Sequence, residues 1–287
     1  LWGYIKKVVI ADRIGILVMA ILKDEAAGGF LLFWAMVLYS FQIYADFSGG
    51  IDVIMGLSEM LDISLTENFR APLVSRSITE FWQRWHMSLG EFMEKYLYYP
   101  IVLNRSVMKF SKRIHNSYLK KVFSATLASV VVFVLVGIWH GTGWTFVLWG
   151  LWHGVFCGAE TLLDRKHTLQ THWYGHVYTL LVVIFGFVLF RAESVPQALM
   201  LLRAMLSGFT PVDACRLALR NLLTAGTVFW CLAGVLACLP LWEHAKARFD
   251  GSRWFSPALD ALTIVGLLLC LMQLASHSFQ PFIYASF

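Results

Sequence analysis

Charged residues are scarce in this sequence. Asp, Glu, Lys and Arg make up 14% of the 287 residues, whereas an ordinary soluble domain carries about 25%. Hydrophobic residues reach 58%, and the mean hydropathy is +0.64. A soluble protein of this length needs far more polar surface to cover its core, and a disordered chain or nucleic-acid-binding tail is much less apolar. The shortage of charge excludes these classes, predicts no nucleic-acid partner, and indicates an integral membrane protein surrounded by a lipid bilayer.

Several catalytic and metal-binding signatures are also absent. The sequence has no CxxC pair, no GxSxG elbow, no Walker loop, no HExxH and no GxGxxG. Its five cysteines are scattered and lie mostly in apolar runs, which favours small buried side chains over a disulfide frame or a zinc site. We expect no metal and no cofactor, and an enzyme with this sequence would use histidine in a membrane cavity. The cysteines are Cys157, Cys215, Cys231, Cys238 and Cys270.

Long charge-free windows are abundant. A membrane-spanning helix needs about 20 apolar residues, so these windows predict about six spans and an all-α polytopic bundle. Residues 8–22 are a weaker candidate because Asp12 and Arg13 lie among them. No internal repeat of the kind found in inverted-repeat transporters is visible, and we treat residues 1–287 as one membrane domain. The charge-free windows are residues 26–45, 122–159 (two spans with a break at 141–143), 167–190, 221–242 and 261–287.

The segment at residues 77–100 has a different pattern. Aromatic and apolar residues recur in it every three or four positions, while charged residues take the opposite side. This predicts an amphipathic or re-entrant helix, or two helices with a break near Gly90, that lies in the membrane interface or lines a polar cavity. Ser77 or Thr79 is expected to cap its start.

Two charge pairs support helix in this segment. Glu80 with Arg84 and Glu91 with Lys95 are spaced i,i+4. His86 lies on the aromatic side, which is unfavourable in a purely interfacial helix because such a helix keeps its polar groups in water.

The most basic stretch is the loop at residues 104–121, which carries six basic residues and no acid. The positive-inside rule predicts that this loop is cytoplasmic. The basic residues are Arg105, Lys109, Lys112, Arg113, Lys120 and Lys121.

His140 follows a long apolar run, in the stretch GIWHGTGW at residues 137–144. A titratable side chain at the end of a charge-free span is costly and is a functional candidate for that reason. The flanking glycines permit a helix break and a close backbone approach. Burial favours the neutral imidazole, which can accept a proton from a hydroxyl as a general base does. A structural histidine bonded to a backbone carbonyl explains the spacing equally well.

Three further histidines carry weaker signals. His153 lies in a similar stretch, GLWHG at residues 150–154, and we expect a structural contact between helices rather than a second polar group of the same cavity. His172 and His176 are four residues apart, a spacing that can hold a metal, but no acid or third ligand is near them. A solvated or interfacial pair is expected there.

Asp46 follows an apolar run as well. A carboxylate within a membrane has to be paired or to face a water-filled cavity, and Arg70, Arg76 and Arg84 are its candidate partners. We expect a buried structural ion pair that fixes the fold.

These stretches together resemble the membrane-bound O-acyltransferases, in particular the bacterial branch that includes the alginate O-acetylation and teichoic-acid D-alanylation proteins. The resemblance runs in order along almost the whole chain. It rests on GYIKKVVIADR at residues 3–13, YADFSG at 44–49, NFRAP at 68–72, SRSITEFWQRWHMSL at 75–89, VGIWHG at 136–141, WGLWHG at 149–154 and PFIYASF at 281–287.

The resemblance implies a helical membrane bundle with amphipathic or re-entrant helices around a central cavity. It implies that the chain is the C-terminal part of a longer core, with several N-terminal spans before it. It also implies that His140 matches the essential histidine of the family and His86 its second, less universal one. The candidates for lining the substrate cavity are Asp46, Arg84, Trp85, Trp139 and His153.

The implied activity is transfer of an acyl group, acetyl being the first expectation, from a thioester donor. The donor is acyl-CoA or an acyl carrier protein, and the acceptor is a cell-surface or exported polysaccharide or an intermediate acyl-acceptor protein. The implied location is the inner (plasma) membrane. His140 would act as the base, while His86 would orient a substrate or hold a hydrogen bond to the acyl carbonyl. The loop at 104–121 would dock an acidic carrier or, as the favoured alternative, meet anionic lipid headgroups.

A membrane transporter, or a structural subunit of a polysaccharide export complex, is the alternative. Either would explain the buried Asp46 and the histidines as a polar path or as packing residues. An acyltransferase requires His86 and His140 to converge on one site, whereas a wide separation would favour the alternatives.

Overall fold

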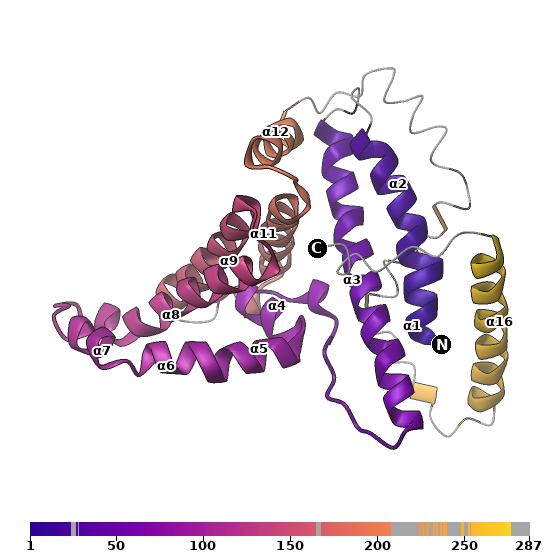
Figure 1. The fold of residues 1–287 in the computed structure, drawn as a ribbon, viewed down its shortest axis with the longest axis horizontal. Helices are drawn as coiled ribbons and strands as arrows, with labels where there is room; N and C mark the ends of the chain where they lie inside the picture. Colours follow the sequence, from indigo (N-terminus) through magenta and orange to yellow (C-terminus); the bar gives the residue numbers. More distant parts are fainter. Residues whose placement is uncertain are drawn as a thin grey trace. The chain divides into compact units, whose positions relative to one another are not determined.

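The computed structural model describes residues 1–23, 27, 29–164, 168–207 and 254–276, together with scattered positions between 224 and 252. Within these residues the chain is helical and has no β-strand (Figure 1). It divides into two compact units, Leu1–Thr66 with Arg203–Phe287 and Glu67–Leu202, and each unit is described by itself. The all-α class predicted from the charge-free windows is confirmed.

Five helices of the described part are long and apolar enough to cross a membrane. They coincide with five of the predicted spans, and the remaining window at 221–242 lies outside the described residues apart from isolated positions. The chain is therefore a polytopic α-helical membrane protein. The helices are α3 (Gly29–Met60), α8 (Ser117–His140), α9 (Trp144–Leu163), α11 (Tyr174–Arg191) and α16 (Phe255–Ser276).

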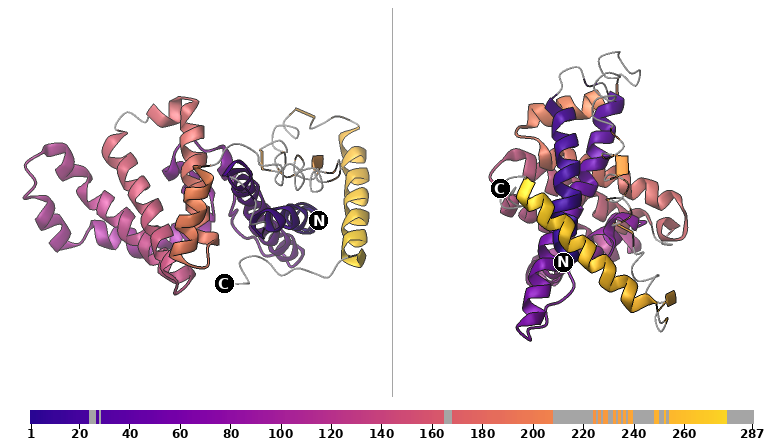
Figure 2. Two further views of the ribbon diagram at one scale, coloured as in Figure 1. Left: turned by 90° about the horizontal axis from the view of Figure 1, so that it is seen from above. Right: turned by 90° about the vertical axis from the view of Figure 1, so that its right-hand side faces the viewer.

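In the first unit, the N-terminal helices pack along α3. The segments α1 (Trp2–Tyr4), the π-helical η1 (Ile5–Ala11) and α2 (Asp12–Lys23) follow one another without a gap and contact α3 (Figures 1 and 2). A methyl group on Gly3 would collide with the carbonyl of Gly49, so the two helices touch at their backbones. The weaker window at residues 8–22 is thus a helix packed against α3, and α16 contacts η1.

In the second unit, α8 and α9 form an antiparallel hairpin, and α11 packs against α9 (Figures 1 and 2). Glycines bring the pair together, because a methyl group on Gly137 would collide with the backbone of Phe146 and one on Gly150 with the backbone of Phe133. Close approach through small residues is how helices associate in a bilayer, where the hydrophobic effect does not drive them together.

The segment at residues 77–100 begins with two separate helices, which was one of the two predicted alternatives. The break between them lies at Trp85 and His86 instead of near Gly90. The first helix, α4 (Ile78–Arg84), ends before Trp85, and α5 (Met87–Met93) begins directly after His86. The predicted break at Gly90 is wrong, since Gly90 lies inside α5. The segment continues as η3 (Glu94–Tyr98) and α6 (Tyr99–Val102).

The predicted start of α4 is confirmed. Ser77 is the N-cap, and its hydroxyl accepts a hydrogen bond from the N–H of Glu80 at 3.0 Å. The ion pair between Glu80 and Arg84 is also present, at 2.6 Å. The remaining short elements are η2 (Pro72–Val74), α7 (Arg105–Ser111), α10 (Thr168–Thr171) and α12 (Val195–Met205).

The basic segment at residues 104–121 is more helical than a loop. Asn104 caps α7 by accepting from the N–H groups of Ser106 and Val107, and Asn116 caps α8 in the same way. Asparagine is among the best N-cap residues, so each cap starts a helix within a stretch that its charges alone mark as a loop. The cytoplasmic position of this segment stays a prediction.

Candidate active site

Backbone pairing holds the break between α4 and α5. Phe69 and Trp85 form an isolated antiparallel bridge, which ties the chain before η2 to the end of α4. These bonds replace helical ones, so the break does not leave buried backbone groups without partners. The flanking bonds run from Arg70 N to Arg84 O and from Met87 N to Asn68 O, each 3.0 Å long.

His86 lies at this break in a left-handed backbone conformation, with φ 47° and ψ 56°. This conformation costs a non-glycine residue about 1–3 kcal/mol and persists only where the surroundings impose it. Here the imidazole stacks over Phe69, with ring centres 6.4 Å apart, and the preceding Trp85 stacks over Phe81 at 5.5 Å. Strain of this kind concentrates at functional sites, which supports His86 as a site residue.

Asn68 determines the tautomer of His86. The Asn68 Oδ1 lies 3.1 Å from His86 Nδ1 and also accepts from the backbone N–H of Ser88, at 3.2 Å. A backbone N–H can only donate, so the atom of Asn68 that it meets must be the oxygen. His86 Nδ1 therefore carries the proton, and Nε2 is the acceptor of the neutral ring. Burial lowers the pKa of His86 below its usual value, so the ring is neutral at pH 7.

His140 ends α8, and Gly141 continues the chain in an extended conformation. The half-buried imidazole lies edge-on to Trp149 and Phe190, with ring centres 5.2 and 5.3 Å away. The imidazoles of His86 and His140 are close enough to interact electrostatically. Both histidines that the sequence marks as catalytic candidates therefore lie in the second unit.

His153 is completely buried on α9. Its Nδ1 lies 3.4 Å from the indole Nε1 of Trp82, which donates to it, and its Nε2 faces Gly186, where a methyl group would collide with it. Rings of Trp82 and Trp149 pack edge-on against the imidazole. The position fits the expected structural contact between helices, because the ring joins α4, α9 and α11.

The other cavity candidates have different surroundings. Trp85 is 3% exposed and packs against Phe187 of α11, whereas Trp139 lies edge-on to His140 and is 60% exposed. Arg84 pairs with Glu80 and lines a polar cavity described below.

Asp46 lies in the first unit and is 1% exposed. Its partner is Lys7, at 2.6 Å, so the prediction of an arginine partner is wrong, although the expected buried ion pair is present. The partner was missed because Lys7 lies in a stretch too charged to predict as a buried helix. Lys7 also bonds Asp12 at 2.8 Å, and the neighbouring Lys6 pairs with Asp52 at 2.6 Å.

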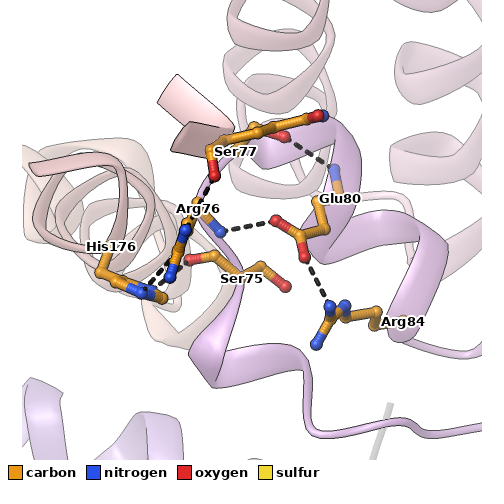
Figure 3. Close-up of polar contacts among 7 residues, drawn as sticks. Ser75, Arg76, Ser77, Glu80, Arg84 and His176 are labelled. Atoms are coloured by element: carbon orange, nitrogen blue, oxygen red, sulfur yellow. Dashed lines mark hydrogen bonds and ion pairs between the residues drawn. The ribbon is translucent and has the colours of Figure 1, made fainter. Parts of the chain in front are cut away.

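His172 and His176 have separate environments. His172 is exposed, directly follows α10, and bonds the carbonyl of Thr168 in that helix. The His176 Nε2 accepts from Arg76 Nε at 3.0 Å, and its Nδ1 donates to the carbonyl of Ser75 at 3.2 Å (Figure 3). Among the described residues, no group of three or more His, Cys, Asp or Glu side chains is arranged to hold a metal ion.

Two positioning residues were missed by the sequence analysis. Asn68 orients His86. The sequence signal that could have identified Asn68 is its position as the first residue of the NFRAP stretch, which is part of the family resemblance. Glu160, near the end of α9, accepts hydrogen bonds from the N–H groups of Ile78 and Thr79, at 2.6 and 2.9 Å. A carboxylate at the first turn of a helix is favourable, so Glu160 anchors α4 on α9, and no sequence spacing pointed to it.

Comparison with known proteins gives a consistent result. The chain matches the membrane-bound O-acyltransferase family over residues 26–201. It is 32% identical to a "Probable alginate O-acetylase AlgI" of Azotobacter vinelandii, over 99% of this chain and 60% of the relative. It is 34% identical to a "Peptidoglycan O-acetyltransferase" of Helicobacter pylori, over 75% of this chain and 39% of the relative.

A more distant similarity extends to a different acyl group. The chain is 29% identical to a "Teichoic acid D-alanyltransferase" of Streptococcus thermophilus, over 50% of this chain and 34% of the relative. The chain spans about 60% of the length of the alginate O-acetylase relative.

Proposed function

The chain belongs to the membrane-bound O-acyltransferase family, and we propose that it carries the histidine site of an enzyme that transfers an acyl group, acetyl first of all, to hydroxyls of a polysaccharide. The observation that carries this proposal is that one compact unit contains both His140, at the end of α8, and His86, whose tautomer is fixed by Asn68 at a left-handed backbone position. The names of the relatives support acetyl transfer to a cell-envelope glycan.

His140 is the proposed general base. The hydroxyl oxygen attacks the carbonyl carbon of a thioester, a C–O bond forms, and the C–S bond breaks. His140 takes the hydroxyl proton and returns it to the departing thiolate. A positioned base contributes typically about 10²–10⁴-fold to such a reaction. The rings of Trp149 and Phe190 around His140 limit the access of water, which would otherwise hydrolyse the thioester.

His86 is proposed to orient the acceptor hydroxyl. Because Asn68 holds the proton on Nδ1, the neutral ring presents Nε2 as an acceptor. An acceptor nitrogen can take a hydrogen bond from a hydroxyl but cannot donate one to a carbonyl oxygen. Of the two roles considered for His86, the geometry supports orientation of a substrate and speaks against a bond to the acyl carbonyl.

The proposed setting follows the sequence expectations. The enzyme lies in the inner membrane, and its donor is acyl-CoA or an acyl carrier protein. The acceptor is the polysaccharide itself or an intermediate acyl-acceptor protein. The basic segment at 104–121 lies on the cytoplasmic side and meets anionic lipid headgroups.

The test is His140→Ala, expressed in the natural full-length protein in cells that lack the wild-type gene. We expect the O-acyl content of the cell-surface glycan to fall to background. His172→Gln is the matched control, since it removes an exposed imidazole that bonds only within α10 and its flank, and it should leave acylation unchanged. Acylation at the wild-type level in His140→Ala protein, at equal membrane abundance, would rule out the mechanism.

A further inference from the structure

A polar cavity of about 730 Å³ lies in the second unit and has no role in the mechanism above. Ligand pockets measure about 300–1,000 Å³, so this cavity is large enough for a phosphate and part of the molecule that bears it. Its lining is basic. The lining residues include Arg70, Arg76, Arg84, Glu80, Gln170 and His176. Figure 3 labels four of them, Arg76, Arg84, Glu80 and His176.

Within the described residues, the guanidinium of Arg76 in this cavity pairs with no carboxylate, and the lining carboxylate of Glu80 bonds Arg76 only at its backbone N–H. Arg70 pairs with Glu67, and Arg84 pairs with Glu80. The guanidinium of Arg76, by contrast, donates to two uncharged acceptors, Nε2 of His176 and the carbonyl of Gln170, at 3.0 and 2.9 Å. None of the ion pairs among the described residues includes Arg76.

The neutral partners hold Arg76 in place without cancelling its charge. His176 donates through Nδ1 to the carbonyl of Ser75 and accepts through Nε2, so its ring is the neutral tautomer. Two of the five N–H donors of the guanidinium are used in these bonds. A fixed guanidinium with further donors is suited to a phosphate group, which accepts several hydrogen bonds at once.

The cavity adjoins the histidine site. Arg70 and Arg84, which line it, are the two residues joined by the backbone bond that flanks the Phe69–Trp85 bridge, and His86 follows Arg84 by two positions. At the far end, Arg76 precedes α4, whose start is anchored by Glu160 near the end of α9. α4 therefore leads from the cavity to His86.

The same end of α9 lies at the start of α8, because the hydroxyl of Tyr118 donates to the carbonyl of Thr161 at 2.8 Å. The start of α4 is consequently at the end of the hairpin that adjoins the basic segment at 104–121, and His140 is at the opposite end of α8.

We propose that this cavity binds a phosphate group, and that the group belongs to the acyl donor. The choice of donor rests on the proposed function: acyl-CoA and acyl carrier proteins both carry the thioester on a phosphopantetheine arm. With its phosphate at Arg76, such an arm extends along α4 toward His86. A phospholipid headgroup offers the same phosphate chemistry and is distinguished by the experiment.

The experiment measures binding and requires no acyl transfer. The complete chain is purified in a neutral detergent, and 4′-phosphopantetheine is titrated against it, with pantetheine as the matched probe that lacks the phosphate. We expect saturable binding of the first and none of the second. In a second arm, the chain in nanodiscs of phosphatidylglycerol is compared with the chain in phosphatidylcholine, as competition against 4′-phosphopantetheine.

Three variants make the assignment specific. Arg76→Gln should weaken binding of 4′-phosphopantetheine at least tenfold, because hydrogen bonds to charged groups are lost. Glu80→Gln removes the carboxylate of the cavity while keeping an acceptor for the N–H of Arg76, and should tighten binding about threefold or more. A gain of binding cannot come from misfolding. Arg113→Gln, an exposed charge of the basic segment, should leave the binding of 4′-phosphopantetheine in neutral detergent unchanged.

The outcomes are separable. Equal binding of pantetheine and 4′-phosphopantetheine, or identical affinity in Arg76→Gln, Glu80→Gln and the wild type, overturns the phosphate site. Complete displacement of 4′-phosphopantetheine by phosphatidylglycerol, lost in Arg76→Gln, keeps the phosphate site and overturns the donor as its source. Failure of the His140→Ala test would leave these binding results standing, so the two proposals fail independently.

Discussion

The two units bury polar groups in opposite ways. In the first unit, Lys7 and Asp46 are almost completely buried, and they are joined as an ion pair. The second unit has a half-buried ion pair as well, Glu80 with Arg84, but its histidines His86 and His153 have neutral partners, an amide and an indole.

The difference separates structural from chemical groups. A buried ion pair is locked, because moving a proton or a partner leaves an isolated charge in an apolar environment. Asn68 holds the proton of His86 on Nδ1, so Nε2 of this half-buried ring remains an acceptor and can take a proton without breaking an ion pair. The first unit is therefore suited to holding helices together, and the second contains the histidines to which we assign proton transfer and substrate orientation.

The largest expected effect on stability comes from Lys7→Met, which tests whether the buried ion pair of the first unit has a structural role. It removes the partner of a carboxylate that is 1% exposed, and we expect a loss of stability of about 3–5 kcal/mol. The measurement is the thermal unfolding midpoint of the purified chain in detergent.

The matched double variant, Lys7→Met with Asp46→Leu, replaces both charges by apolar groups. It should recover most of the lost stability, since no unpaired charge remains at Asp46. A double variant as unstable as the single one would show that the pair is not the source of the effect.

The second unit is tested through activity. His86→Ala should lower the rate of acyl transfer at least about 100-fold while leaving the unfolding midpoint nearly unchanged. The assay is single-turnover transfer from a thioester to a soluble glycan by the natural full-length protein. A fall in stability as large as that of Lys7→Met would place His86 among the structural groups.

Asn68→Asp sharpens the same point through pH. A carboxylate in place of the amide favours the imidazolium, so the pKa of His86 rises from its lowered position. The neutral ring is then lost at a higher pH as the pH falls, and the acid limb of the activity profile should move upward. An acid limb at the wild-type position would exclude the bond between Asn68 and His86 from the mechanism.

A smaller effect is expected from Trp82→Phe. It leaves Nδ1 of the buried His153 without its donor, at a cost of about 1–2 kcal/mol; the 3.4 Å bond is long, which keeps the effect below that of an ion pair. Chemical denaturation measures the change. An effect equal to that of Lys7→Met would erase the distinction between the two units.

The smallest effect is expected from Ser77→Ala. Loss of the N-cap of α4 should cost about 1 kcal/mol. Ser106→Ala is the control, because only the backbone N–H of Ser106 takes part in the cap of α7. Unfolding midpoints that do not differ between the two variants would show that α4 is held by Glu160 alone.

The spans were predictable because each is a local property of composition. The windows at 26–45 and 122–159 match α3, α8 and α9 closely. The helix α3 extends beyond its window to Met60, because its carboxylates Asp46 and Asp52 form ion pairs with Lys7 and Lys6. Ser77 and Glu80 were predictable for the same reason, since capping and i,i+4 pairs depend on neighbours in sequence.

The missed features all depend on residues far apart in the sequence. The helix breaks at His86 because the backbones of Arg70 and Asn68 bond Arg84 and Met87 on either side of it, and nothing within residues 77–100 signals this. Asp46 pairs with Lys7, which lies 39 positions earlier in the sequence. The sequence pattern had suggested only arginines that follow Asp46 as its partners. Glu160 reaches α4 across 82 positions. Such pairings follow from the packing of helices, which periodicity does not determine.

The bridge between Phe69 and Trp85 has an evolutionary consequence. It fixes His86 through backbone amides and carbonyls, which every residue other than proline supplies in the same way. The side chains of Arg70 and Arg84 are therefore not needed to position His86, and they can be replaced without displacing its imidazole. A lineage with this scaffold can vary the side chains that line the neighbouring cavity while the backbone that positions His86 keeps its geometry.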